Sequence, residues 1–363
     1  MMLALNEIRR GRGRFLSIIA ALSLIVFLVL TLAALGDGLF FGSTGAVRST
    51  TATAYAFDEK AEGSLIRSSL KEKQVDKVAQ EPGVSQASPV GVLLTAGETP
   101  AGEADVAVFG IEAGGAGSPS TRIEGRLPGP DEDNVAAIDK ALADTGVAVG
   151  DTVSVGPVDA EVVGVVSDTS YQLQPTVWTS IDTWREMRNA VRPEFTGVTD
   201  DISAIAIVGE PGQAPTIAGL SVLTADQTGL SIPGVEQQKS TLNTIIYTAL
   251  AVAALVVALF FALVVLEKRE LFAALKALGT PTRKLGFGVV VQAVIASVIG
   301  IVIGALASRG LGLIVPEEVP TLFRNDTLVT IAIFTVVAGV LGAAFSLRRI
   351  AKIDPATAIG GAL

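Results

Sequence analysis

Two residue types that carry much enzyme and metal chemistry are missing from this chain of 363 residues, which has no histidine and no cysteine. Disulfides are therefore impossible, and the usual zinc sites, cysteine nucleophiles and histidine general bases are excluded. No Gly-Lys pair occurs, so the chain also lacks a Gly-x-x-x-x-Gly-Lys phosphate loop. No paired-carboxylate or Ser-His-Asp arrangement is visible. We therefore expect no catalytic residue, no metal site and no cofactor of the chain's own.

The elements that remain to be explained are four long apolar runs. A helix that crosses the hydrocarbon core of a bilayer needs about 20 apolar residues, and charge near the bilayer centre is costly. Uncharged runs of this length occupy residues 15–35, 244–266, 285–308 and 327–347. We predict an α-helical membrane protein with four transmembrane helices. The first run is longer than the apolar core of a cleaved signal peptide, so we expect it to be retained.

The third run contains Gly300 and Gly304, which are four residues apart. Small residues at this spacing let a second helix approach closely. The alternative is that these glycines only make the helix thinner.

The charged residues divide the chain into an acidic block and basic flanks. Residues 36–243 hold 29 Asp or Glu and 13 Lys or Arg, a net charge of −16, and the rest holds 7 acidic and 14 basic residues, or +7. Lys and Arg accumulate in cytoplasmic loops. Here they gather before the first run, between the second and third, and after the fourth. This pattern predicts cytoplasmic termini, with residues 36–243 and the loop 309–326 outside.

The acidic block is predicted to be an extracytoplasmic α+β domain inserted between helices 1 and 2. Short runs rich in β-branched residues predict strands, and amphipathic runs that end at Gly or Pro predict helices. Strands are expected at residues 87–96, 104–113, 160–168 and 201–210, and a strand or turn leading into a helix at 175–190. Helices are expected at residues 68–84 and from 134 to about 146, the latter followed by a strand. Residues 112–133 are expected to form a loop, and residues 42–57 either a flexible connector or the start of the domain.

One span, a large outside domain and three clustered spans resemble the layout of FtsX/MacB-type ABC transporter permeases. Four stretches resemble that family in the same order along the chain: "LALNEIRRGRGRF", "GRLPGPDEDNVAAIDKALADTGVAVGDTVSV", "EKRELFAALKALGTPTRKL" and "KIDPATAIGGAL". The first implies a cytoplasmic amphipathic helix over residues 1–14, and the last a cytoplasmic tail over 348–363. Within the family, the chain is most similar to heme-exporter (HrtB-type) permeases, through its start, "GDGL" after the first run, "SDTSY" at 167–171, and "IDPATAIGG".

The resemblance implies that ATP is bound and hydrolysed by a separate cytoplasmic ABC ATPase dimer. Its docking element is expected within residues 267–284, where "RELFAALKALG" places Leu271, Leu275 and Leu278 on one helical face and Lys276 elsewhere. Gly279, followed by a proline, ends that helix. A juxtamembrane helix lying on lipid headgroups is the alternative. The family also implies a permease homodimer that works by mechanotransmission, without a wide aqueous channel.

The same resemblance implies heme as the transported ligand, taken from the lipid at the outer leaflet. Tyrosine can ligate heme iron, and Tyr171 and Glu236 are the candidate contacts. Phe40 and Phe41, at the outer end of the first span, are candidates for stacking on a porphyrin. The alternatives are a half-buried tyrosine at a domain edge, a solvated glutamate and ordinary interfacial aromatic anchors. Val235 stands near the position where other exporters carry a tyrosine.

Two rival functions remain open at this point. One is export of another amphiphile, such as an antimicrobial peptide, a lipid or a drug. The other is a signal-transmitting FtsX-like complex that transports nothing, although that class usually has a smaller external domain. In each case we expect a multi-pass protein of a bacterial plasma membrane, with lipid around it and no nucleic-acid partner.

Overall fold

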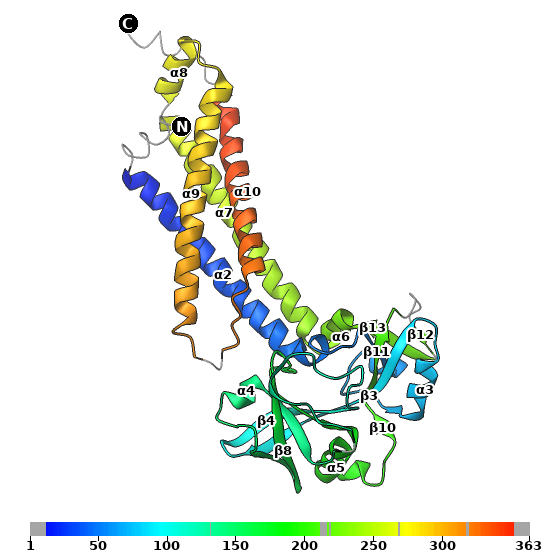
Figure 1. Cartoon of the computed structure of the whole chain (residues 1–363). Helices are drawn as coiled ribbons and strands as arrows, with labels where there is room; N and C mark the ends of the chain where they lie inside the picture. The colour runs from blue at the N-terminus through cyan, green and yellow to red at the C-terminus, as the bar shows by residue number, and fades with distance from the viewer. Residues whose placement is uncertain are drawn as a thin grey trace. The chain divides into compact units, whose positions relative to one another are not determined.

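The structure, a computed structural model, describes residues 12–130, 132–210, 216–217, 219–267, 269–316 and 319–351. The chain divides into two compact units: Met1–Gly38 with Ser240–Leu363, and Leu39–Lys239. The first unit is helical and the second is a mixed α+β unit (Figure 1). The predicted N-terminal helix over residues 1–14 lies outside the described residues up to residue 11, and the predicted tail lies outside them from residue 352.

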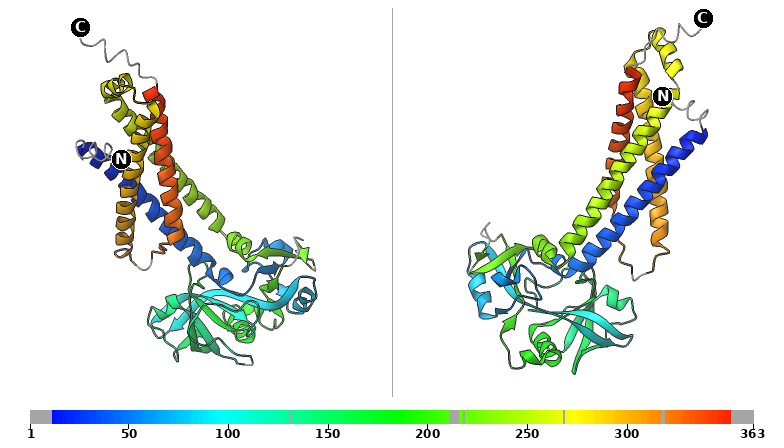
Figure 2. Two further views of the ribbon diagram at one scale, coloured as in Figure 1. Left: turned by 45° about the horizontal axis from the view of Figure 1, so that its top comes forward. Right: turned by 180° about the vertical axis from the view of Figure 1, so that it is seen from behind.

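The helical unit contains the four predicted spans. In the described part of the chain, four helices are long and apolar enough to cross a membrane: Phe15–Arg48, Val235–Glu267, Arg283–Gly312 and Asn325–Ala344. The helices that contain them are α2 (Arg12–Arg48), α7 (Val235–Glu267), α9 (Thr282–Gly312) and α10 (Asn325–Ala351). Helices α9 and α10 run side by side in both further views (Figure 2). Each predicted apolar run lies inside a longer helix.

Glycines allow the helices of this unit to approach closely. A Cβ atom added to Gly304 of α9 would lie 2.8 Å from the Ser23 carbonyl oxygen of α2, and one added to Gly300 would lie 3.0 Å from Leu22 Cβ. A Cβ on Gly342 of α10 would lie 2.8 Å from the Ala254 carbonyl oxygen of α7. The predicted packing role of the Gly300–Gly304 pair is confirmed, because no side chain larger than hydrogen fits there without movement.

A short helix, α8 (Arg269–Ala277), follows α7. It turns Phe272 and Ala273 into a buried cluster formed with α2, α7, α9 and α10. The helix ends as predicted at Gly279, whose φ is +86°. The Gly279 N–H donates to the Lys276 carbonyl and the Thr280 N–H to the Leu275 carbonyl, which are the two bonds of a Schellman cap.

The α+β unit is built on one large mixed sheet of eleven strands, with a separate two-stranded ribbon. The strand order is β12-β13-β1-β11-β3-β4-β9-β6-β8-β5, and β7 pairs with β3 and β8. The β4–β9 and β6–β8 pairs are parallel and the others are antiparallel. The ribbon pairs β2 with β10. The strands are β1 (Ala54–Phe57), β2 (Leu70–Lys71), β3 (Val84–Thr99), β4 (Gly102–Ile111), β5 (Arg122–Gly125), β6 (Val135–Asp139), β7 (Thr152–Val155), β8 (Val158–Val166), β9 (Thr176–Ser180), β10 (Asp201–Ile202), β11 (Ala204–Gly209), β12 (Thr216–Ile217) and β13 (Leu220–Thr224).

The α+β unit also contains short helices. They are η1 (Glu59–Ala61), α3 (Lys73–Ala79), α4 (Lys140–Ala143), α5 (Ile181–Val191), η2 (Pro193–Phe195) and α6 (Ala225–Ser231). Helix α5 lies against β3 and β4 at two glycines: a Cβ on Gly91 or Gly110 would come within 2.3 or 2.5 Å of Trp184. The indole therefore sits directly on the backbone of the sheet.

The strands predicted at 87–96, 104–113 and 160–168 are confirmed within this sheet, and the one predicted at 201–210 is divided between β10 in the ribbon and β11 in the sheet.

Two helix predictions were wrong in part. Residues Val135–Asp139 form strand β6, between β8 and β9, and only Lys140–Ala143 is helical. Ala136, Ala137 and Ile138 are fully buried, so pairing on both sides outweighs their local helix propensity. In the 68–84 segment only Lys73–Ala79 is helical, because Leu70 and Lys71 pair with β10. The expected loop at 112–133 contains the short strand β5, and the open question at 42–57 resolves into the end of α2 and the start of β1.

Candidate functional site

The end of α2 carries two aromatic rings in contact with two cations. The rings of Phe40 and Phe41 meet edge to face, with centroids 5.4 Å apart. The guanidinium carbon of Arg48 lies 5.2 Å from the Phe40 centroid and 5.0 Å from the Phe41 centroid, and Lys239 Nζ lies 4.3 Å from the Phe40 centroid. These distances are in the range of cation–π attraction. We call Phe40, Phe41, Arg48 and Lys239 the aromatic–cation cluster.

Helical geometry explains how the cluster assembles. Helix α2 continues without a break past Leu35 to Arg48, and residues seven or eight apart return to the same face after two turns. Arg48 therefore lies over Phe40 and Phe41. Lys239 comes from the second turn of α7. Both rings are half-buried, and Phe40 also packs against the core of the α+β unit.

One carboxylate neutralises part of the charge of this cluster. Arg48 Nη1 donates to Asp226 Oδ1 of α6 at 2.9 Å, and the two side chains are 31% and 78% exposed. Among the described residues, Lys239 pairs with no carboxylate. The cluster thus gathers two of the unit's few cations, whereas the unit as a whole is strongly negative.

Glu236 lies beside this cluster along α7. It is exposed in the first turn of the helix, where a negative charge is favoured by the helix dipole. Glu236 and Lys239 are three residues apart and so lie on the same side of the helix. The structure therefore brings Phe40, Phe41 and the turn that carries Glu236 into one region.

Tyr171 does not join them, although the sequence placed it among the candidate contacts. Its side chain is completely buried, its ring meets Phe109 edge to face at 5.4 Å, and Phe109 stacks on Trp178 at 4.7 Å. The hydroxyl is buried without a hydrogen-bond partner among the described residues. Burial raises the pKa of this phenol above its ordinary value of 10, which disfavours the phenolate that iron ligation requires. In this conformation Tyr171 is a core residue that no porphyrin can reach.

The backbone around Tyr171 is nonetheless fastened to the end of α2. The Gln172 N–H donates to the Ser43 carbonyl, the Leu173 N–H to the Gly42 carbonyl, and the Ala46 N–H to the Ser170 carbonyl, at 3.0–3.1 Å. A Cβ on Gly45 would lie 2.5 Å from the Asp168 carbonyl oxygen. The segment that carries Tyr171 thus fixes the helix turns that present Phe40 and Phe41.

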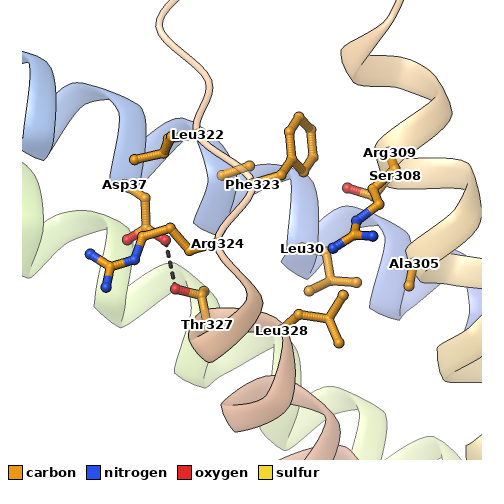
Figure 3. A pocket seen from close by; sticks show the side chains of 11 residues that line it. Leu30, Asp37, Ala305, Ser308, Arg309, Leu322, Phe323, Arg324, Thr327 and Leu328 are labelled. Carbon is orange, nitrogen blue, oxygen red and sulfur yellow. Dashed lines mark hydrogen bonds between the residues drawn. The ribbon is translucent and has the colours of Figure 1, made fainter. Parts of the chain in front are cut away.

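A small cavity lies in the helical unit, where α2, α9, α10 and the α9–α10 loop meet (Figure 3). Its volume of about 20 Å³ is enough for one water molecule and far too small for an amphiphile. Thr327 Oγ1 donates to Asp37 Oδ2 at 2.6 Å beside it, and the Leu322 N–H donates to the Ala34 carbonyl. These bonds tie the α9–α10 loop to α2.

Helix α8 exposes the predicted leucine face. Phe272 and Ala273 point into the helical unit, whereas Leu271 is 48% exposed and Leu278, just past the helix end, is 82% exposed. Leu275 is half-buried, and so is Lys276. The described residues leave Leu271 and Leu278 exposed, and exposed apolar residues gathered on one face are typical of an interaction surface.

Comparisons with known proteins show the family. A model described as "MacB-like periplasmic core domain" matches residues 15–219, more than half of the chain, and "FtsX-like permease C-terminal" matches residues 243–355. The chain belongs to the family of FtsX-like permeases with a MacB-like periplasmic core domain. The fold class predicted from the sequence is confirmed: an α+β extracytoplasmic domain is inserted between the first two of four candidate transmembrane helices.

Relatives of this permease match it along nearly its whole length. An "Uncharacterized ABC transporter permease" of Mycobacterium tuberculosis is 29% identical over 99% of both chains. A "Putative hemin transport system permease protein HrtB" of Staphylococcus epidermidis is 23% identical, again over 99% of both chains. Among solved structures, the periplasmic region of MacB from Actinobacillus actinomycetemcomitans is 15% identical, with a TM-score of 0.36, and covers 50% of this chain and 92% of its own. The protein is an ABC transporter permease, and such a permease works with an ATPase partner.

Reasoning from the sequence missed two residues of the permease's cluster. Arg48 carried a signal, because it follows Phe41 by seven residues and the helix could have been extended to reach it. Lys239 carried none, since its contact with Phe40 joins positions that are far apart in the sequence.

Proposed function

We propose that this ABC permease exports heme, taken from the outer leaflet of the membrane at the end of α2. The observation that carries the proposal is the aromatic–cation cluster beside Glu236. Two half-buried phenyl rings offer apolar contact to a flat ring system, and the cations suit the carboxylates that heme bears. The full-length likeness to permeases named for hemin transport supports the same ligand.

Glu236 is the proposed iron contact. It is exposed, it lies on the same side of α7 as Lys239, and a carboxylate oxygen is a possible ligand for ferric iron. Phe40 and Phe41 would contact the porphyrin after the cations that cover their rings have moved toward the propionates. Tyr171 contributes indirectly: the backbone of its segment is hydrogen-bonded to the turns of α2 that present the two rings.

The energy for export is proposed to come from a separate cytoplasmic ATPase dimer that binds and hydrolyses ATP. The exposed face of α8, with Leu271, Leu275 and Leu278, is its proposed docking surface, and Lys276 lies beside that face. Phe272 and Ala273 join α8 to the buried cluster of the long helices, so a movement of α8 is passed directly to the spans. We propose that two permease chains form a homodimer in the lipid, with both termini in the cytoplasm.

The experiment that tests heme as the ligand uses the full chain, purified in phosphatidylcholine nanodiscs and titrated with hemin. We expect a shifted Soret band at a stoichiometry of one heme per site, and a weaker shift for Glu236→Gln. Glu186→Gln, on the exposed side of α5, is the matched control and should titrate like the wild type. A strain without the permease should also become sensitive to hemin.

Heme export would be contradicted if the Soret band did not shift and the strain without the permease tolerated hemin but was sensitive to another amphiphile. That result would favour the second candidate, export of an antimicrobial peptide, lipid or drug from the same cluster. A complex that needs ATP turnover but moves neither kind of ligand would favour a signal-transmitting role.

A further inference from the structure

The charge of the aromatic–cation cluster sets it apart from the rest of the α+β unit. Residues 36–243 carry a net charge of −16, so an anion is repelled by this domain as a whole. At the end of α2, however, Arg48 and Lys239 converge on Phe40 from two different helices, and Asp226 pairs with Arg48 alone. Two cations that meet at one ring give an anion a local binding partner on a domain that otherwise repels it.

The bond between Arg48 and Asp226 shows that the cluster accepts a carboxylate. Arg48 uses one guanidinium nitrogen, Nη1, for its bond to Asp226. A guanidinium has five donors in a planar fork and binds a carboxylate best with two of them. Asp226 therefore holds Arg48 with a single bond from a largely exposed position, where a surface ion pair contributes little. A second carboxylate could replace it with little loss.

The apolar half of the site is also present. Phe40 and Phe41 lie about one and a half turns beyond Leu35, the last residue of the apolar run; Arg48 lies over both rings and Lys239 over Phe40. A molecule with a carboxylate on an apolar body could place its charge on Arg48 and Lys239 and its body on the rings.

We infer that Arg48 and Lys239 form a recognition site for the carboxylate of an amphiphilic acid, and that Asp226 is the resident counter-ion which the ligand displaces. The inference deepens the proposed function, on which it rests, by naming the substrate class of the same cluster: apolar molecules with a carboxylate, of which heme with its propionates is one. Neutral amphiphiles of the same shape bind weakly. Arg48 is thereby a specificity-determining residue, and Lys239 supplies the second charge.

The test compares acids with their own methyl esters, which differ only in the charge. The full chain in phosphatidylcholine nanodiscs is titrated with hemin and hemin dimethyl ester by absorbance, and with 11-(dansylamino)undecanoic acid and its methyl ester by fluorescence. We expect each acid that binds to do so about tenfold more tightly than its ester, as a charge-assisted hydrogen bond predicts. Arg48→Gln and Lys239→Gln should reduce this ratio toward one without weakening ester binding.

A variant that is expected to tighten acid binding, rather than weaken it, distinguishes a specific effect from simple misfolding. Asp226→Asn removes the competing carboxylate and should tighten acid binding by a few-fold. Arg122→Gln and Lys77→Gln, at exposed positions of β5 and α3, are matched controls and should leave the ratio unchanged.

Equal binding of acids and esters, or a ratio that Arg48→Gln and Lys239→Gln leave intact, would overturn the inference. Its failure can be told apart from that of heme export. If hemin and its ester bind equally well, heme export stands and the acid site falls. If the dansyl acid outbinds its ester while hemin does not bind, the acid site stands and heme falls.

Discussion

Tyr171 shows why residue type and sequence context do not by themselves define a ligand. The residue has a suitable oxygen and follows a stretch similar to that of heme exporters, yet its ring lies in the core between α2 and the sheet. Its loop forms three backbone hydrogen bonds with the last turns of α2, so the segment itself has a structural role.

Substitutions of Tyr171 should separate a role of its hydroxyl as an iron ligand from the role of its ring in core packing. Tyr171→Phe removes a buried hydroxyl without a described partner and should leave the free energy of unfolding unchanged or raise it by up to about 1 kcal/mol. Tyr171→Ala leaves a large cavity and should cost about 3–5 kcal/mol. Urea unfolding followed by tryptophan emission measures both, because the two tryptophans of the chain, Trp178 and Trp184, are buried in this same unit.

The hemin titration is the second readout for these variants. Tyr171→Phe should keep the wild-type Soret shift, since its hydroxyl is out of reach. Loss of the shift with unchanged stability would show that the core opens and that the phenol ligates iron.

At the level of the candidate site, the sequence could identify Phe40, Phe41 and Glu236 because each follows or precedes an apolar run on the same helix. It could not identify Lys239 as their neighbour, because that contact depends on how α7 begins beside α2. Burial decided the case of Tyr171, and burial depends on the whole sheet rather than on the five residues around it.

At the scale of elements, α8 exposes Leu271 and Leu278 and carries the proposed docking surface for the ATPase. Leu275→Asp places a charge at the half-buried member of its leucine face. We expect association with the ATPase to weaken by about a hundredfold, because an unpaired charge would be desolvated at the interface. Copurification of the tagged ATPase with the permease measures this.

Leu275→Met, which keeps the volume and the apolar character, is the control and should bind as the wild type does. Normal copurification of Leu275→Asp would assign this face to the lipid headgroups instead.

Elements with a strong periodic signal were predicted from the sequence, and those fixed by pairing were not. The four spans, α5 and the long strands β3, β4 and β8 have a hydrophobic pattern that only one structure satisfies. The segment from residue 134 has many helix-forming residues, but β8 and β9 pair with both edges of Val135–Asp139, and this pairing decides its conformation.

At the scale of the whole molecule, the charge difference between the two parts predicts which side of the membrane each faces. The chain contains no cysteine, so any cysteine introduced is unique. Two exposed positions are suitable for a single cysteine: Glu194 in the α+β unit (Glu194→Cys) and Leu278 just after α8 (Leu278→Cys). In intact cells a membrane-impermeant maleimide should label the first, and it should label the second only after permeabilisation.

Labelling of Leu278→Cys in intact cells, or protection of Glu194→Cys, would reverse the topology and remove the docking role of α8. Insertion of both variants can be checked by equal labelling after detergent solubilisation.

The unbroken course of α2 has a mechanical consequence. The helix that begins at residue 12 is still helical at residue 48, and its last turns are bonded to the segment that leads into β9. Residues 42–46 of this helix therefore cannot move away from residues 170–173 without breaking three backbone hydrogen bonds.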